Sequence, residues 1–429
     1  MGKSDQTSRV THVGLDCHRK FSTLSGRDAA GKVIVRQKLD HADRAAMGRD
    51  LSLFARGTPV VLEGSFGWGW VCEELSAAGL EPHLASGSKM GGWRKARGIA
   101  KNNKLDANLL SEVWEEKQRW WEVWLPPIEV RDQRELLRYR MSLVAIQTGL
   151  KNRVHALLHR HGVLHGHSDL FGAAGRQFLA ELAAEQDATL RGSARQVLGG
   201  YLKLLEQLRA SIARVTRQFR KEVKGRPEAR RLMTLPGVSW VLAYTILAEV
   251  GRIDRFRNKR ALARYSCLAP LADDSGEDDG SAPIGRHVGH AGRRTLKWAW
   301  IEAAHGAVRH GGKFKAIFDR RTDRGKRDRN RGYIAVADDL CKLAYVLWTK
   351  EVDYTDDPPP RPGSQPGPAT GKTTTTSAPK HQAGPAAGKT INISSPKDLA
   401  GETDSRSGTG QPDCTMARGR PQGRRQVSL

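Results

Sequence analysis

THVGLDCHR, residues Thr11–Arg19, is the stretch that decides the fold, because it places one carboxylate at the end of a short apolar strand. Asp16 closes that strand. A strand that ends in Asp can hold an oxygen ligand rigidly at the edge of a sheet, and two or three such carboxylates from separate elements make a Mg²⁺ site for phosphodiester chemistry. Acidic residues at the ends of later elements are therefore candidate partners of Asp16.

Two further β-like runs follow at Phe21–Gly26 and Lys32–Leu39, separated by short polar turns. This spacing predicts an antiparallel meander of three strands. Helical spacing of Ala, Met and Leu over Asp43–Arg56 then precedes another strand, TPVVLE, which closes on Glu63. Glu63 is the second candidate ligand.

Strands and helices alternate after Glu63. The pattern predicts a helix at Trp68–Ala78, a strand at Glu81–Ala85 and a helix at Asn103–Lys117 that carries Asp106 in its first turn. A strand with Asp, a later strand with Glu and a later helix with Asp follow one another as in RNase H-like (RuvC-type) nuclease folds. We therefore expect an α/β domain with a mixed sheet over residues 10–125, with Trp120–Pro127 as the linker that follows.

The rest of the folded chain is expected to be all-α. Glu129–His161 and Gln177–Lys224 are long and rich in Arg, Leu and Ala, which predicts a helical coiled-coil hairpin with a basic face over residues 126–225. A solvated charged face is the competing interpretation. Residues 226–354 are expected to form a mainly helical domain, with a helix-hairpin-helix-like element around the Pro-Gly turn at 236–237 and a closing helix at Asp338–Tyr354.

Composition indicates a polyanionic partner. The 429 residues carry a formal charge of +25. Residues 355–429 contain 11 of the 19 prolines and no Phe, Trp or Tyr, which predicts a disordered C-terminal tail. Of the 71 basic and 46 acidic residues, only 10 and 6 lie in that tail, so most of the charge belongs to the predicted domains. Nucleic acid is the expected partner.

Cysteine usage and hydropathy exclude several classes. Five cysteines without CxxC spacing argue against a disulfide framework and against a cysteine zinc site. No apolar run approaches transmembrane length, so we expect no membrane contact and a cytoplasmic location. Five histidines crowd the hairpin turn, namely His155, His159, His161, His165 and His167. The first two have the i, i+4 spacing that could hold Zn²⁺, and a polar turn beside nucleic acid is the alternative.

A second set of candidate residues lies far downstream, in the loop LADDSGEDDGS, which contains Ser275. The carboxylates, the helical spacer and this loop, in that order, resemble the transposases of the insertion-sequence one-ten family, DEDD-type recombinases that use a serine and are guided by a bridge RNA. The motifs that carry the resemblance are VGLD at Val13–Asp16, VLEG at Val61–Gly64, AKNNKLDA at Ala100–Ala107, KNRVHALL at Lys151–Leu158, LPGV at Leu235–Val238, CLAPLADDSG at Cys267–Gly276 and GRRTLKWAWIEAA at Gly292–Ala304.

One residue departs from the family pattern. The third element of the family usually carries two aspartates, and here Asn103 stands at the first of these positions while Asp106 fills the second. An Asn side chain offers a carbonyl oxygen to Mg²⁺ but lends no charge to the site.

The resemblance implies separate roles for the carboxylates and for Ser275. Asp16, Glu63, Asn103 and Asp106 would hold Mg²⁺, and Ser275 would attack phosphorus to give a covalent phosphoserine–DNA intermediate. An element-encoded RNA would select donor and target DNA, with the two domains meeting across protomers of a dimer or tetramer. The protein would be bacterial and would associate with the nucleoid when bound to DNA. Candidate nucleic-acid contacts are Lys151, Arg153, Arg293, Arg294 and Lys297, and ordinary surface charge is their alternative interpretation.

Two other functions fit parts of this pattern. A metal-dependent DNA nuclease or Holliday-junction resolvase would use the carboxylates alone and make Ser275 irrelevant. A catalytically impaired relative that only binds nucleic acid would explain Asn103.

Overall fold

The computed structural model describes residues 6–65, 67–99, 103–116, 118–184, 190, 192–269, 292–326 and 328–355. The predicted tail and Ser275 lie outside these residues. Among these residues, Lys151–Lys203 form one compact unit, and the residues up to Leu150 together with those from 204 to 355 form the other. No helix among the described residues combines the length and the apolar character needed to cross a bilayer.

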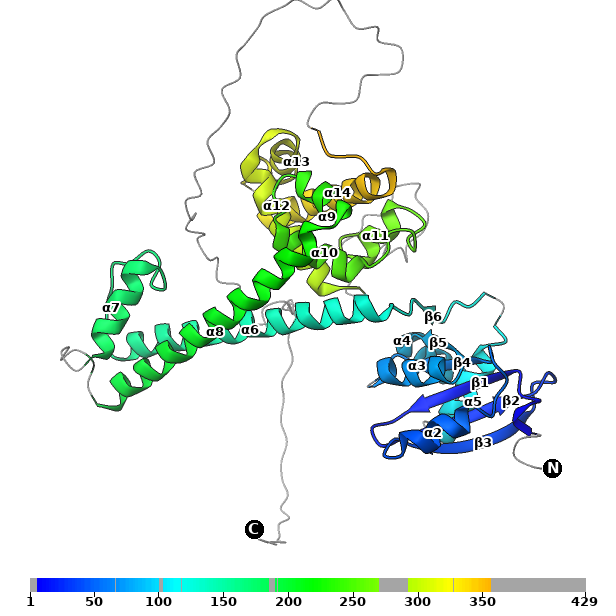
Figure 1. Ribbon diagram of the computed structural model, residues 1–429. Coiled ribbons are helices and arrows are strands. Elements are labelled where there is room, and N and C mark those ends of the chain that lie inside the picture. Colours follow the sequence, from blue (N-terminus) through cyan, green and yellow to red (C-terminus); the bar gives the residue numbers. More distant parts are fainter. Residues whose placement is uncertain are drawn as a thin grey trace, which may run out of the picture. The chain divides into compact units, whose positions relative to one another are not determined.

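The N-terminal part is built on a six-stranded mixed sheet with the order β3-β2-β1-β4-β5-β6 (Figure 1). Strands β1 to β3 form an antiparallel meander, β4 and β5 run parallel to β1, and β6 is antiparallel to β5. The mixed sheet and the meander were expected and are confirmed, and the order is consistent with an RNase H-like domain. The strands are β1 (His12–Cys17), β2 (Phe21–Arg27), β3 (Val33–Asp40), β4 (Pro59–Glu63), β5 (Glu81–Ala85) and β6 (Glu122–Val123).

Helices cover both faces of this sheet. On one face, α2 (Arg44–Leu51) and α3 (Trp68–Ala77) share a buried core with side chains such as Leu15 and Leu62. On the other face, α4 (Gly87–Ala96) and α5 (Asn103–Val113) pack over side chains such as Val61. Strand side chains alternate between the two faces, so β4 supplies Val60 and Leu62 to one core and Val61 to the other.

Three predictions for this region need correction. The sequence did not predict α4, because the glycine pair at 91–92 weakens its helical pattern. Helix α5 ends at Val113, four residues before the predicted end. The expected linker at Trp120–Pro127 contributes the edge strand β6, and Trp121 is fully buried beneath the helices, so this segment belongs partly to the core.

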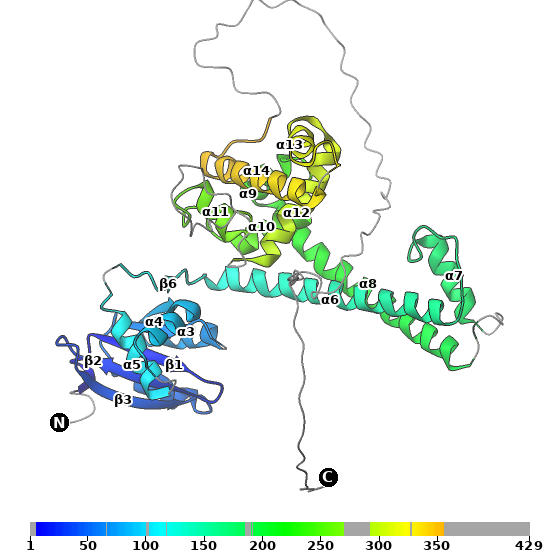
Figure 2. The ribbon, with the colours of Figure 1, turned by 180° about the vertical axis from the view of Figure 1, so that it is seen from behind.

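The following part is helical, as expected. Helices α6 (Ile128–Arg160) and α8 (Ser193–Lys224) lie side by side in both views (Figures 1 and 2). Arg140 Nε donates a hydrogen bond to Thr216 Oγ1 at 3.0 Å between them. The second long helix, predicted to be continuous from Gln177, is instead interrupted after α7 (Ala173–Ala183). Gly192, whose φ of 59° is incompatible with a helix, precedes α8.

The remaining helices surround a second core. They are α9 (Pro227–Thr234), α10 (Trp240–Val250), α11 (Lys259–Tyr265), α12 (Arg294–His310), α13 (Gly312–Thr322) and α14 (Arg329–Lys350). Phe219 and Tyr244 stack at 3.7 Å between ring centroids, and Trp300 is fully buried. Helix α14 begins nine residues before the predicted helix, because Asp328 caps it by accepting a hydrogen bond from the Asn330 backbone.

The Pro-Gly turn between α9 and α10 packs on α12. A Cβ at Gly237 would lie 2.1 Å from the Ala303 carbonyl oxygen, and the φ of Gly237 is 82°. Only glycine satisfies both conditions. The glycine of this predicted helix-hairpin-helix-like element is therefore needed for packing against α12.

Candidate active site

Two acidic residues end neighbouring parallel strands. In the pairing of β1 with β4, Leu15 lies opposite Leu62. The next residues are Asp16 and Glu63, which therefore stand at the same level at the carboxyl ends of their strands. Adjacent strands lie about 4.8 Å apart, so the two carboxylates are neighbours at one edge of the sheet.

Gly14 shows which face these carboxylates occupy. A Cβ at Gly14 would lie 2.2 Å from both the Ala107 carbonyl oxygen and the Ser111 backbone nitrogen, so α5 rests directly on β1. Asp16 follows Gly14 by two residues and therefore lies on the face that α5 covers. Glu63 follows Val61, whose side chain is in the core beneath α4 and α5, and so shares that face.

The direction of α5 brings its first turn to the same edge. His12, at the start of β1, lies 3.5 Å from Glu115, just beyond the end of α5. From there to the end of β1 the overlying helix runs backward, past Ser111 and Ala107 to Asp106. The first turn, with Asn103 and Asp106, thus points toward the strand ends that carry Asp16 and Glu63.

Basic groups accompany two of the carboxylates. His18 Nε2 lies 3.0 Å from Asp16 Oδ2, and Arg94 Nη1 of α4 lies 3.5 Å from Asp106 Oδ1. Glu63 meets the start of α4, since a Cβ at Gly87 would lie 2.4 Å from Glu63 Oε1. The positive end of the helix dipole favours a carboxylate there. Arg94 could not be predicted as a partner of Asp106, because α4 itself was not predicted.

The carboxylates of Asp16, Glu63 and Asp106 are chemically suitable ligands for a divalent cation. Carboxylate oxygens from two strands and one helix are the ligands that hard divalent ions prefer. Within the described part of the chain, no three His, Cys, Asp or Glu side chains already form a group that could hold a metal ion. The three carboxylates share one face and one edge of the sheet, although they are not arranged as a closed ligand sphere.

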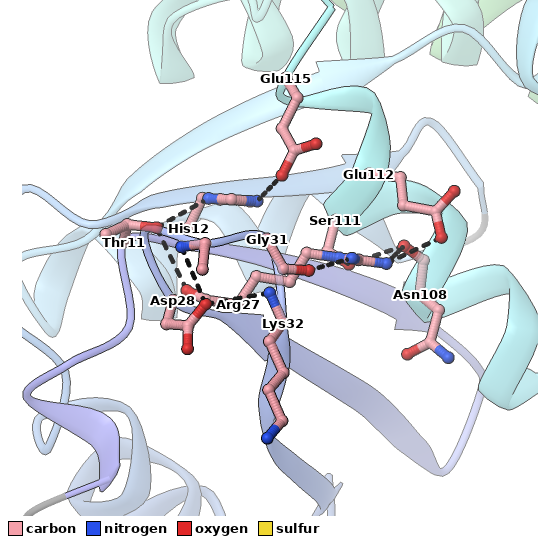
Figure 3. Close-up of polar contacts among 11 residues, drawn as sticks. Thr11, His12, Arg27, Asp28, Gly31, Lys32, Asn108, Ser111, Glu112 and Glu115 are labelled. Atoms are coloured by element: carbon pink, nitrogen blue, oxygen red, sulfur yellow. Dashed lines mark hydrogen bonds and ion pairs between the residues drawn. The ribbon is translucent and has the colours of Figure 1, made fainter.

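Arg27 fastens the other end of α5 to the sheet (Figure 3). Its guanidinium donates from Nε to Ser111 Oγ at 2.8 Å and from Nη2 to Glu112 Oε1 at 2.8 Å, while Nη1 reaches the Gly31 carbonyl. Ser25 of β2 adds a hydrogen bond to Asn108 at 2.6 Å. These bonds fix the helix that carries Asp106. Arg27 was not predicted as a functional residue, because it lies in a strand with no motif around it.

The cysteines near the predicted sites are poor nucleophiles. Cys17 lies next to Asp16, and burial, reinforced by the charge of Asp16, raises the pKa of its thiol. Burial likewise raises the pKa of Cys267, which precedes the segment that contains Ser275. A thiol with a raised pKa carries little thiolate at neutral pH. Cys72, Cys267 and Cys341 are free thiols.

Comparisons with known proteins agree with this geometry. A family model described as "Transposase IS116/IS110/IS902 family" matches residues 229–319, and a DEDD transposase model of the IS110 group matches residues 13–162. The second match spans the strand and helix ends that carry Asp16, Glu63 and Asp106. This chain belongs to the IS110 transposase family.

Curated relatives extend the likeness over most of the chain. The transposase for insertion sequence element IS1111A of Coxiella burnetii is 25% identical over 354 residues, which cover 80% of this chain and 90% of the relative. A probable family 20 transposase of Pseudomonas aeruginosa is 26% identical over 306 residues, covering 70% and 85%. The expected resemblance to the insertion-sequence one-ten family is thus confirmed, and so is a DNA transposase activity.

Ser275 of this IS110-family transposase lies outside the described residues, but both ends of its segment are placed. The backbone nitrogen of Arg293 donates to the Tyr265 carbonyl at 2.9 Å. A Cβ at Gly292 would lie 2.6 Å from the same carbonyl oxygen, so glycine is needed there. Tyr265, Gly292 and Arg293 therefore lie close together although residues 270–291 separate them in sequence, and we call these three residues the neck.

The predicted nucleic-acid contacts occupy different environments in the transposase. Arg293 is engaged at the neck, Arg294 is exposed at the start of α12, and Lys297 is half-buried one turn later. In the unit from Lys151 to Lys203, Lys151 Nζ lies 4.9 Å from the centre of the Phe171 ring, and Arg153 is exposed.

The histidines of the hairpin turn pack on aromatic rings. His155 contacts Phe171 edge-on at 5.4 Å between ring centroids, and His167 lies 5.2 Å from Phe178. Burial, with the charges of His165 and Lys151, lowers the pKa of His155. No third His, Cys, Asp or Glu joins His155 and His159 in a metal-binding group among the described residues. This packing supports the polar turn over the zinc site.

Proposed function

We propose that this transposase cuts and rejoins DNA with a metal-binding carboxylate set and a serine nucleophile. The observation that carries the proposal is the meeting of Asp16, Glu63 and the first turn of α5 on one face at one edge of the sheet. A scissile phosphate bound over that edge would meet carboxylates from three separate elements.

Asp16, Glu63 and Asp106 would hold Mg²⁺, together with the side-chain oxygen of Asn103. The bound ion would supply Lewis-acid stabilisation of charge on the phosphate oxygens. The chain's own contribution is to hold these side chains in position. Arg27 holds α5 in place for this purpose, and the positive end of the α4 dipole lies beside Glu63.

Ser275 is proposed to be the nucleophile. Its Oγ forms a bond to phosphorus, the bond from phosphorus to one deoxyribose oxygen breaks, and that oxygen leaves as an alcohol. The proton lost by the serine passes to a base, since a free hydroxyl is a weak nucleophile. The phosphoserine link conserves the phosphodiester energy for rejoining to a second DNA end.

An element-encoded bridge RNA and an assembly of several protomers complete the proposal. The formal charge of +25 suits a protein that holds two kinds of phosphate backbone while base pairing selects the sequence. Composite sites across a dimer or tetramer would bring Ser275 of one protomer to the carboxylates of another.

The test is recombination of DNA from the flanks of the element, supplied with the adjoining RNA. Asp16→Asn, Glu63→Gln and Asp106→Asn should each lower recombination by at least about a hundredfold. Glu81→Gln is the matched control, because Glu81 lies at the opposite end of β5 with its side chain 63% exposed. Wild-type rates in all three variants would refute the role of the carboxylates.

Asn103 favours a second candidate, a relative that binds nucleic acid but is catalytically impaired. The neutral amide leaves the site one negative charge short of the family pattern. Absence of recombination in the wild type, together with its presence in Asn103→Asp, would establish this alternative.

A further inference from the structure

Two arginines form ion pairs with one buried carboxylate at the neck, and a third arginine lies nearby. Glu249, near the end of α10, is only 2% exposed. Its Oε2 lies 3.8 Å from Arg134 Nε and 3.6 Å from Arg293 Nε. Both separations are too long for hydrogen bonds, so these are loose ion pairs. With Arg255 and Tyr265, these residues form what we call the neck cluster.

Arg134 is the structural member of the neck cluster. It is 3% exposed and donates from Nε to the Ala248 carbonyl at 2.9 Å and from Nη2 to the Glu249 carbonyl at 2.8 Å. These bonds satisfy the last carbonyls of α10, where the helix dipole is negative. The Arg134 guanidinium therefore binds the backbone of α10 and stabilises the fold.

The Arg255 guanidinium is held between aromatic rings, and one of its buried nitrogens has no hydrogen-bond partner among the described residues. Its guanidinium carbon lies 4.3 Å from the Trp124 ring centre, 4.1 Å from that of Phe256 and 4.3 Å from that of Tyr265. Nε donates to the Val250 carbonyl at 2.9 Å, whereas Nη2 is buried without a hydrogen-bond partner among the described residues. A buried donor left without a partner is costly, unless a ligand completes it.

Arg293 links the cluster to the Ser275 segment. Its Nε lies 3.1 Å from the Tyr265 hydroxyl oxygen, and its side chain is 39% exposed. It is also the N-cap of α12, a helix of 17 residues with no side-chain cap and no acidic residue in its first turn. The free N–H groups and the positive dipole end of such a helix favour an anion beside Arg293.

Within the described part of the chain, the neck cluster carries more positive than negative charge. Arg134, Arg255 and Arg293 carry three positive charges, and Glu249 is the carboxylate they share. Burial lowers the pKa of Arg134 and of Arg255, which shows that their surroundings disfavour the charged form. Arginine edges in such a setting match the oxygens of a phosphodiester, which they bind in a bidentate manner.

We propose that Arg255 and Arg293 form a phosphodiester-binding site at the base of the Ser275 segment, with Glu249 and Arg134 as its frame. The role of this site, which is to present the DNA backbone to Ser275, rests on the proposed function. The binding itself depends on the described residues of the helical part alone. Neither the sequence motifs nor the proposed active site uses Arg255, Arg134 or Glu249.

The test measures the salt dependence of binding to a duplex of arbitrary sequence by the full chain. Arg255→Gln and Arg293→Gln should each reduce the slope of log K against log salt by about 0.9, the value for one lost phosphate contact. Arg252→Gln is the matched control, because Arg252 is in the same loop, is exposed and is paired with Asp254. Unchanged slopes in both neck variants would overturn the site.

A second measurement covers variants that fold poorly. Inorganic phosphate should raise the melting temperature of the wild type more than chloride at equal ionic strength, and Arg255→Gln should lose this difference. Arg293→Lys should keep the fold and the slope but bind the duplex more weakly, because lysine cannot form the bidentate contact. Equal stabilisation of wild type and Arg255→Gln by phosphate would refute the site.

Ser275→Ala separates this site from the proposed function. The variant should keep the wild-type salt slope and the stabilisation by phosphate. If it also keeps full recombination, the serine mechanism fails while the phosphate site stands. If Ser275→Ala is inactive while Arg255→Gln and Arg293→Gln bind DNA with wild-type slopes, the phosphate site alone fails.

Discussion

At the scale of single residues, glycine matters as much as the carboxylates do. Gly14 lets the backbone of α5 touch β1, and Gly87 leaves room for the Glu63 carboxylate at the start of α4. A methyl group at either position would displace the helix or the ligand. The acidic residues supply the chemistry, and these two glycines allow the elements that carry it to approach one another.

Asn103→Asp should lower the Mg²⁺ concentration needed for half-maximal recombination several-fold. The added carboxylate would restore the negative charge that the family pattern has at this position, and hard cations bind carboxylates more strongly than amides. A magnesium titration of both proteins measures the effect. Identical half-maximal concentrations would mean that Asn103 is not a ligand.

His12 should make stability depend on pH. Burial is the main cause that lowers its pKa from 6.5, outweighing the opposing charge of Glu115. The unfolded chain therefore binds more protons, so this contribution is complete above about pH 6.5 and is lost as the pH falls through the folded-state pKa. His12→Gln should flatten the pH dependence of the free energy of unfolding in that acidic range.

Urea unfolding at a series of pH values measures this effect. The same substitution at His161, which is exposed, is the control. A His12→Gln variant that loses stability on acidification as steeply as the wild type would contradict the assignment.

At the scale of elements, α5 decides whether the carboxylates meet. Its first turn carries Asn103 and Asp106, while its last turns are fastened to β2 by Arg27 (Figure 3). The C-terminal turns of α5 are therefore fixed to the sheet away from the site, and this attachment positions the candidate ligands in its first turn.

Arg27→Ala should cost about 2–4 kcal/mol of unfolding free energy, because a nearly buried guanidinium and its partners lose their hydrogen bonds. Arg97→Ala is a close control. Arg97 also pairs with Glu112, at 2.7 Å, but is 46% exposed, so its loss should cost about 0–1 kcal/mol. Hydrogen exchange of α5 amides should quicken in Arg27→Ala only. Equal costs for the two variants would show that Arg27 does not hold the helix.

Most elements of the sheet domain could be predicted from sequence because their signals are local. Alternating apolar residues marked β1 to β5, Asp16 and Glu63 came at the ends of strand patterns, and Asp106 came in the first turn of a helical one. Helix α4, strand β6 and the break before α8 were missed, because they depend on packing and on glycine conformations that single segments do not show. Arg27 and Arg94 became visible only once α5 and α4 were placed. The roles of Asn103 and Ser275 remain predictions.

At the scale of the whole molecule, charge defines the partner. Residues up to 354 carry 61 basic and 40 acidic side chains, so a charge of +21 remains without the tail. Removal of residues 356–429 should therefore leave DNA affinity and its salt slope close to wild type. Electrophoretic mobility shifts at several salt concentrations test this. A fall in slope by several units would place the main DNA-binding surface in the tail instead.

The most direct test of the account is whether Ser275 becomes covalently linked to DNA. The wild-type protein, incubated with Mg²⁺, the adjoining RNA and labelled DNA from the flanks of the element, should give a protein–DNA adduct that survives denaturing electrophoresis. Ser275→Ala should give neither adduct nor recombination while retaining its fold and its DNA binding. Undiminished cleavage by Ser275→Ala, with no adduct from either protein, would contradict the account and identify a nuclease that uses its carboxylates alone.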